Sequence, residues 1–144
     1  MSTLEKAISI AAASHSGQLE KNGRPYILHP IRVMMSVVGA GANAQIAAVL
    51  HDVVEDTTTT FADLHAAGFS AEILDAIRIL THDKANDYFA YVRAAAANAI
   101  TCAVKRADLR DNMDLSRIPD PQEQDLARIR RYQDALSILD VAVV

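Results

Sequence analysis

The sequence predicts an all-α fold, and its composition and patterning support this prediction. Half of the 144 residues are hydrophobic, yet aromatic residues are few and tryptophan is absent. Alanine is abundant while glycine and proline are scarce, which favours packed helices over a sandwich or a barrel. No repeat, linker or low-complexity segment divides the chain, so we expect a single domain over residues 1–144.

Three helices are expected in the first third of the chain. Ser2 or Thr3 can cap the first, and a loop containing Asn-Gly and a proline follows it. Pro30 suits the first turn of the second helix, which runs to a Gly-Ala-Gly break. Asn43 is expected to cap the third, which continues through an apolar run into an acidic stretch. The apolar stripe expected for the first helix is Leu4, Ile8, Ala11 and Ala12. The apolar residues that continue the second and third helices are Ile31, Val33, Met34, Val37, Val38, Ile46, Val49 and Leu50.

Helical patterning continues to the end of the chain. A short helix is expected over 61–67, and Ser70 can cap the next one. Two helices are predicted over 88–97 and 98–112, and a turn at Pro121 leads into a final helix. The buried positions expected in these helices include Ile73, Leu74, Ile77, Leu80, Ile100, Ala103, Val104, Ala107, Leu126, Ile129, Leu136 and Leu139.

Charge and cysteine content narrow the class of protein. The formal net charge of −4 argues against a non-specific nucleic-acid binder, which usually presents a basic face. Cys102 is the only cysteine and lies in an apolar run, so we expect a small buried hydrophobe and no disulfide. No apolar run approaches the roughly 20 residues needed to cross a bilayer, and no signal peptide is evident. We therefore expect a cytoplasmic protein without a membrane partner.

The stretch His-Asp-Val-Val-Glu-Asp at 51–56 concentrates groups that can bind metal or move protons. On a continuous helix, His51 would stack above Glu55, and Asp52 above Asp56, because side chains four residues apart share a face. Burying several unpaired acids is costly, so a cation is expected there. The alternative is a solvated acidic helix end.

Two further places offer metal ligands at the ends of apolar helices. These are His29 and Asp108, which together with His51 and Asp52 make a mixed nitrogen and oxygen set. Such a set suits a six-coordinate Mn²⁺, Fe²⁺ or similar ion with open positions better than a closed structural zinc site. Open positions hold water and a substrate oxygen, which is the arrangement for metal-assisted hydrolysis.

Several segments resemble the signatures of HD-domain phosphohydrolases, above all the hydrolase domain of RelA/SpoT homologues and the stand-alone small alarmone hydrolases. The matching segments are Tyr26–Pro30, His51–Thr57 and Lys105–Met113, and His15–Gln18 matches the opening motif of that family. The resemblance extends from about residue 5 to residue 139. It implies an all-helical HD-domain bundle.

The resemblance also implies the roles of individual residues. One Mn²⁺ would be held by His29, His51, Asp52 and Asp108, with Fe²⁺, Co²⁺ and Zn²⁺ as alternative ions. Glu55 and Asp56 would position and activate water as catalytic acids. The implied reaction removes the 3′-pyrophosphate from a purine nucleotide such as (p)ppGpp or (p)ppApp.

On the substrate side, the resemblance assigns Lys21, Arg24, Asn112 and Arg131 to nucleotide and phosphate contacts. Two positions depart from the pattern of the family. Many members carry a basic residue where this chain has Glu20, and the family commonly reads His where this chain has Asp111.

These departures leave two alternative functions open. The same metal site could act on another phosphate ester, such as a nucleoside monophosphate or NADPH, and release phosphate. Alternatively, the chain could be a catalytically idle nucleotide-binding module.

Overall fold

The computed structural model describes residues 2–141, which are helical except for loops and one isolated antiparallel bridge between Leu19 and Pro25. This confirms the predicted all-α class. None of the helices in these residues is long and apolar enough to cross a membrane. The helices are α1 (Leu4–Ser14), α2 (Leu28–Ser36), α3 (Ala42–Leu50), α4 (Val53–Asp56), α5 (Phe61–Ala66), α6 (Ala71–Leu80), α7 (Tyr88–Ala96), α8 (Ala99–Asn112) and α9 (Glu123–Asp140), with 3₁₀ helices η1 (Val38–Ala40) and η2 (Leu115–Arg117).

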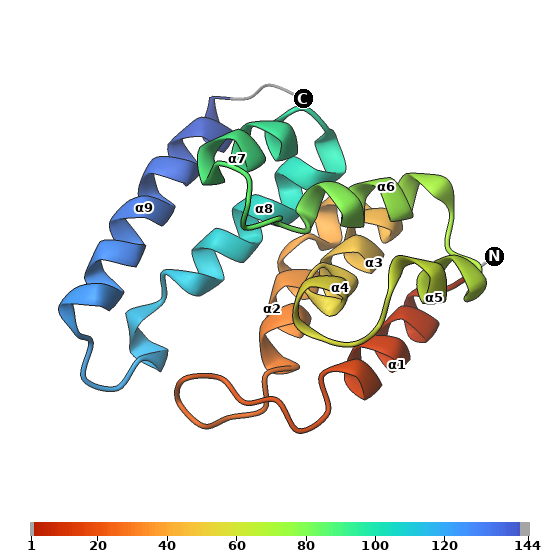
Figure 1. The fold of residues 1–144 in the computed structure, drawn as a ribbon, viewed down its shortest axis with the longest axis horizontal. Helices are drawn as coiled ribbons and strands as arrows, with labels where there is room; N and C mark the ends of the chain where they lie inside the picture. Colours follow the sequence, from red (N-terminus) through yellow and green to blue (C-terminus); the bar gives the residue numbers. More distant parts are fainter. Residues whose placement is uncertain (1, 142–144) are drawn as a thin grey trace.

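Helix α8 lies between two hydrophobic clusters (Figure 1). Its Val104 and Ala107 join a larger cluster formed mainly with α1, α2, α3 and α6. Its Cys102 and Leu109 join a smaller cluster with α7 and α9. Cys102 is therefore the buried hydrophobe that the sequence predicts. The core stripe predicted for this helix was Ile100, Ala103, Val104 and Ala107, and α8 also buries Leu109 against the smaller cluster.

Helix starts follow the expected capping chemistry at two positions. Thr3 Oγ1 accepts a hydrogen bond from the Lys6 N–H at 3.2 Å, and Ser70 Oγ accepts one from the Ile73 N–H at 3.3 Å. Each bond satisfies an amide that has no partner inside its own helix.

The expected cap of α3 is wrong. Gly41, at φ 99°, is the N-cap residue, and Asn43 lies in the first turn, where its amide donates to Glu72 Oε2 at 3.0 Å. Glycine is favoured at this positive φ, which lets α3 begin directly after η1. Helix α2 ends at Ser36, before the glycines and not at them, and η1 follows it.

The inward orientation predicted for Leu126 is also wrong, because this side chain is 41% exposed. Helix α9 buries Ala135 and Leu139 in its second half, against α7 and α8. Its first half contributes no buried apolar side chain, and Arg128 in that half lines a hollow. The apolar pattern therefore describes only the part of α9 that has a packing partner.

Candidate metal centre

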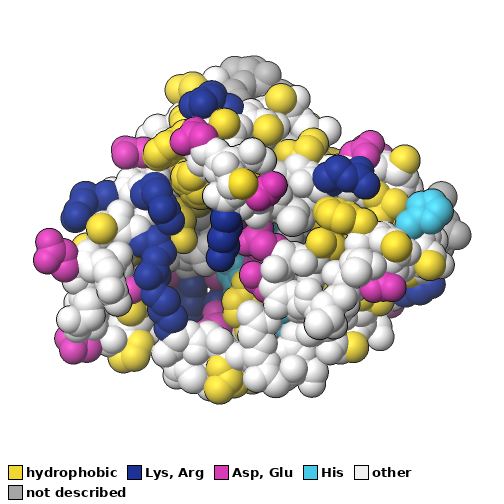
Figure 2. All heavy atoms as spheres, in the orientation of Figure 1, with side chains coloured by type: hydrophobic (Ala, Val, Ile, Leu, Met, Phe, Trp, Pro, Cys, Tyr) yellow, Lys and Arg dark blue, Asp and Glu magenta, His cyan; other side chains and the backbone are white. Residues whose placement is uncertain are grey.

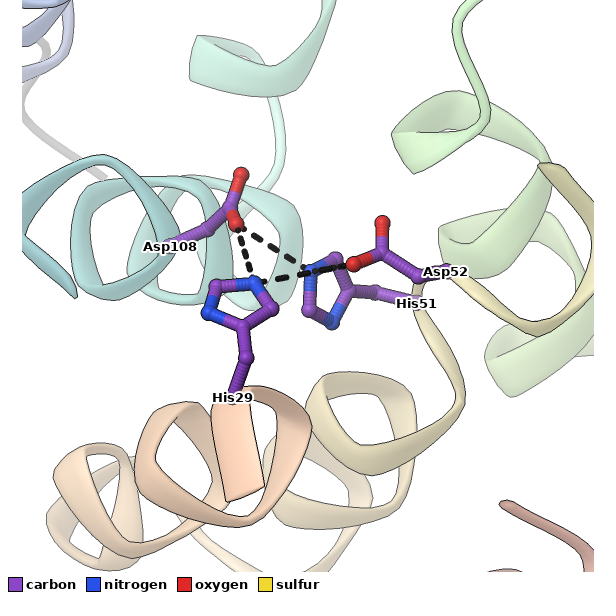
Figure 3. Close-up of side chains that lie close together, drawn as sticks. All are labelled: His29, His51, Asp52 and Asp108. Carbon is purple, nitrogen blue, oxygen red and sulfur yellow. Dashed lines mark hydrogen bonds and ion pairs between the residues drawn. The ribbon is translucent and has the colours of Figure 1, made fainter. Parts of the chain in front are cut away.

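Four side chains from three separate segments meet in the interior, as the sequence predicted (Figure 3). His29 comes from the first turn of α2, His51 and Asp52 from the turn after α3, and Asp108 from α8. Their candidate ligand atoms all lie within 4.8 Å of one another. We call these four residues the metal cluster.

The distances within the metal cluster are short. Asp108 Oδ1 lies 3.0 Å from His29 Nε2 and 3.2 Å from His51 Nε2. Asp52 Oδ2 lies 3.1 Å from His51 Nε2 and 3.5 Å from His29 Nε2. Two imidazole nitrogens and two carboxylate oxygens therefore converge on one point, and this donor set fits a divalent cation.

The helix does not continue from α3 into the acidic stretch, so the prediction of one continuous helix over His51 to Asp56 is wrong. Helix α3 ends at Leu50 and the short helix α4 starts at Val53. The carbonyl of Ala48 accepts hydrogen bonds from the His51 N–H at 3.4 Å and from His51 Nδ1 at 2.5 Å. In a continuing α-helix that carbonyl would accept the N–H of Asp52 instead. The resulting turn lets adjacent side chains face the same point, which a regular helix would place about 100° apart.

The charges of the metal cluster stabilise one another. Burial opposes protonation of His29, but hydrogen bonds to Asp108 and Asp111 outweigh it and raise the pKa of this imidazole to about 9. Burial opposes ionisation of Asp52, but the nearby His51 lowers its pKa to about 2. The pKa of Asp108 is lowered in the same way, against burial, mainly by Lys105 and His51. Without a metal ion, protonated imidazoles therefore keep the carboxylates ionised, and a divalent cation would take the place of those protons.

Neighbouring side chains hold the ligands in place. Tyr26 Oη donates to Asp52 Oδ2 at 2.5 Å, and Lys105 Nζ donates to Asp108 Oδ2 at 2.8 Å. Neither Tyr26 nor Lys105 was predicted from the sequence as a site residue. Their spacing indicated a place near the site. Tyr26 stands three residues before His29, and Lys105 stands three residues before Asp108, so each can lie on the same side of a turn as a predicted ligand.

The two predicted catalytic acids lie beside the metal cluster. Carboxylate oxygens of Asp52, Glu55 and Asp56 lie within 4.8 Å of one another. Glu55 Oε1 accepts a hydrogen bond from the His82 N–H at 2.7 Å. Partial burial, together with the neighbouring carboxylates, raises the pKa of both Glu55 and Asp56.

A hollow of about 450 Å³ opens above the metal cluster, and we call it the metal hollow. Figure 2 shows Lys and Arg side chains along its α9 side, with acidic and histidine side chains visible inside. It therefore offers cations to an anionic ligand and carboxylates to a metal or a proton. Its lining residues are Tyr26, His29, Asp52, Glu55, Asp56, His82, Lys84, Tyr88, Tyr91, Lys105, Asp108, Asn112, Arg131 and Tyr132.

A second hollow of about 260 Å³, which we call the loop cavity, adjoins the first. The two share Tyr26, His29, Asn112 and Tyr132. A ligand longer than one phosphate group could therefore extend from the metal cluster into the loop cavity. The loop cavity is lined by Gln18, Leu19, Glu20, Lys21, Asn22, Tyr26, His29, Asn112, Asp114, Arg117, Ile118, Arg128 and Tyr132.

The structure brings three of the four predicted substrate-contacting residues to these hollows. Asn112 lines both and donates to Asp108 Oδ1 at 3.2 Å. Arg131 lines the metal hollow, with its guanidinium 4.8 Å from the centre of the Tyr88 ring. Lys21 lines the loop cavity and forms an ion pair with Asp125 at 3.0 Å.

The fourth predicted contact, Arg24, lies elsewhere. It lines a separate depression beside Arg117 and Pro119 that does not include the metal cluster. Glu20, which stands where many family members carry a basic residue, pairs with Arg32 at 2.5 Å. The loop from α1 to α2 therefore directs these charged side chains to different places.

Comparison with known proteins agrees with this geometry. The profile of the HD domain family matches residues 7–111. The chain is 34% identical over 141 residues to the guanosine-3′,5′-bis(diphosphate) 3′-pyrophosphohydrolase of Danio rerio, covering 90% of this chain and 77% of that protein. It is 28% identical over 120 residues to the enzyme of the same name from Aquifex aeolicus. That match covers 76% of this chain but only 17% of the longer protein.

A solved structure shares the fold along almost the whole chain. It is that of a metazoan orthologue of SpoT, described as hydrolysing ppGpp, and it superposes with a TM-score of 0.79 at 25% identity. The alignment covers 99% of this chain and 88% of that one. The chain belongs to the HD domain family. Within that family it is similar to the hydrolases of the RelA and SpoT type.

Proposed function

We propose that this chain is a metal-dependent pyrophosphohydrolase that removes the 3′-pyrophosphate from an alarmone nucleotide such as (p)ppGpp or (p)ppApp, and that residues 1–144 act as one HD domain. One observation carries the proposal. A buried cluster of two histidines and two aspartates forms the floor of a hollow whose rim presents both acids and cations. The activity for which the Danio rerio and Aquifex aeolicus relatives are named supports this substrate class.

The metal cluster would hold one divalent ion, for which we propose Mn²⁺. Bound there, this ion supplies Lewis-acid polarisation of a phosphoryl oxygen. Glu55 and Asp56 would orient the attacking water and accept its proton. Their carboxylates lie beside Asp52 and their pKa values are raised, which supports this role.

The cations of the metal hollow would offset the charge of the phosphate groups. Lys84 and Arg131 are exposed and line the same hollow as the proposed catalytic acids. Lys105 is buried and already paired with Asp108, so we assign it to holding that ligand. The nucleoside would extend into the loop cavity, where Lys21, Asn112 and Tyr132 are available for contact.

Product analysis tests the proposal. The purified chain, with Mn²⁺, is incubated with ppGpp and ppApp, and with a nucleoside monophosphate and NADPH as other phosphate esters. Phosphorus NMR then separates pyrophosphate from phosphate. We expect pyrophosphate from an alarmone nucleotide, lost with a chelator and in Asp52→Ala but retained in the matched surface variant Asp75→Ala.

Two results would overturn the proposal in different ways. Release of phosphate alone from a monophosphate or NADPH would select the broader phosphatase. Tight nucleotide binding with no turnover, in protein shown to bind Mn²⁺, would select the idle binding module.

A further inference from the structure

A chain of charged side chains connects the loop cavity to one ligand of the metal cluster. Glu20 Oε1 lies 2.5 Å from a terminal guanidinium nitrogen of Arg32. The guanidinium of Arg32 binds both carboxylate oxygens of Asp111, at 2.8 and 3.1 Å. Asp111 Oδ2 then accepts a hydrogen bond from His29 Nδ1 at 2.6 Å. We call Glu20, Arg32 and Asp111 the charged relay.

The charged relay is largely shielded from solvent. The side chains of Glu20 and Asp111 are only 12% and 11% exposed. Arg117 gives Asp111 a second cationic partner at 3.2 Å and also pairs with Asp114 at 2.9 Å. Each carboxylate of the relay therefore has a guanidinium partner. Bidentate pairing of Arg32 with Asp111 also fixes the plane of that carboxylate.

The contact with Asp111 favours a proton on Nδ1 of His29. Nε2 faces Asp108 Oδ1 at 3.0 Å, and a metal ion bound in the cluster would take the place of a proton between these two atoms. With Nδ1 kept protonated by Asp111, the Nε2 lone pair would then be available to that ion. His51 is oriented differently, because its Nδ1 donates to the backbone carbonyl of Ala48. One histidine is thus fixed by the main chain and the other by a side chain from α8.

We propose that Asp111 is a positioning residue for metal binding, which fixes the ring and tautomer of His29, and that Arg32 and Glu20 hold Asp111 in place. This inference rests on the proposed metal site. It also joins the two departures from the family pattern noted in the sequence, since Glu20 and Asp111 bind the same guanidinium group. The acid at position 20 is therefore neutralised inside the relay instead of standing free in the loop cavity.

Mn²⁺ titration by calorimetry tests this proposal without reference to catalysis. Asp111→Ala is expected to bind Mn²⁺ about 10- to 100-fold more weakly than wild type, the range for loss of a group that orients a metal-binding histidine. Asp111→Asn is expected to recover part of the affinity, because its amide oxygen can still accept from Nδ1. Arg32→Gln removes the pairing that holds Asp111 but keeps the residues His29 and Asp111 themselves. It is therefore expected to weaken binding less than Asp111→Ala. Asp75→Asn, which alters an exposed ion pair on α6, is the matched control.

Nitrogen NMR of the histidine rings supplies a second readout. In the neutral form of His29 we expect a larger share of the Nδ1-protonated tautomer in wild type than in Asp111→Ala, because Asp111 favours a proton on Nδ1 whereas Asp108 favours one on Nε2. Affinity and tautomer equal to wild type in folded Asp111→Ala would overturn this proposal while leaving the metal site intact. If Asp111→Ala does not fold, unchanged affinity in Arg32→Gln would overturn it. Absence of Mn²⁺ binding by wild type would instead overturn the proposed metal site, and this inference with it.

Discussion

The metal cluster and the rim of the metal hollow differ in how far their charged side chains are buried and held by hydrogen bonds. In the metal cluster, His29, His51 and Asp108 are buried, and Asp52 accepts a hydrogen bond from a tyrosine. On the rim, Glu55, Asp56 and Arg131 are exposed. A pre-arranged cluster suits binding of a fixed ion, whereas exposed groups remain free to meet water and phosphate. Changes in the cluster should therefore abolish binding, and changes on the rim should alter rate or substrate affinity.

The largest effect is expected for Asp108→Asn, a change in the buried metal cluster. This change removes the carboxylate that links both imidazoles and leaves Lys105 buried without its partner. We expect loss of Mn²⁺ binding, loss of activity and destabilisation by about 3–5 kcal/mol. Calorimetric titration and denaturant unfolding measure these effects, with Asp75→Asn as the control. Mn²⁺ binding at wild-type affinity would remove Asp108 from the ligand set.

A large effect on rate alone is expected for Glu55→Gln. The variant keeps the size of the side chain but cannot accept a proton, so kcat should fall about 10²- to 10⁴-fold while Mn²⁺ affinity changes little. Glu72→Gln, on the exposed side of α6, is the matched control. A fall in Mn²⁺ affinity that parallels the fall in kcat would place Glu55 among the metal ligands instead.

A shift of the pH profile is expected for Asp56→Asn. Glu55 must be ionised to accept a proton, so activity should fall as the pH drops through its pKa. Burial and the charges of Asp52 and Asp56 raise that pKa above the ordinary value of a glutamate. Removing the charge of Asp56 should therefore move the acid limb of the kcat profile to lower pH. An acid limb that stays fixed, or moves to higher pH, would contradict the role of Glu55.

The smallest effect is expected at the cationic side of the rim, for Arg131→Met. An exposed charge pairing with phosphate contributes about 0.2–1 kcal/mol, so KM should rise by a few-fold with kcat nearly unchanged. Arg130→Met removes a neighbouring exposed cation that does not line the metal hollow. Steady-state kinetics of both variants test the assignment, and equal KM values for the two would contradict it.

The metal cluster could be predicted from the sequence because each ligand lies at the end of an apolar helix within a motif of recognisable spacing. The turn at His51 could not, because a bond from the His51 side chain to the Ala48 carbonyl ends the helix there. Periodicity alone carries no information about such a bond.

The surroundings of the metal cluster were less accessible to sequence reasoning. Tyr26 and Lys105 belong to the segments that resemble the family signatures, and their spacing to the ligands could have identified them as neighbours of the metal cluster. The charged relay depends on the approach of Arg32 to Glu20 and Asp111, which are 12 and 79 residues away along the chain. Only the packing of α2 against α8 brings the more distant pair together. The misplaced Leu126 has a similar cause, because the pattern of α9 does not reveal where its packing partner ends.

Anomalous X-ray diffraction from crystals grown with Mn²⁺ tests the central claim most directly. We expect one strong manganese peak bounded by His29, His51, Asp52 and Asp108. Asp52 also belongs to a second acidic group with Glu55 and Asp56, which offers a competing position for an ion. A peak held only by that second group, or none near either histidine, would contradict the assignment of the metal cluster.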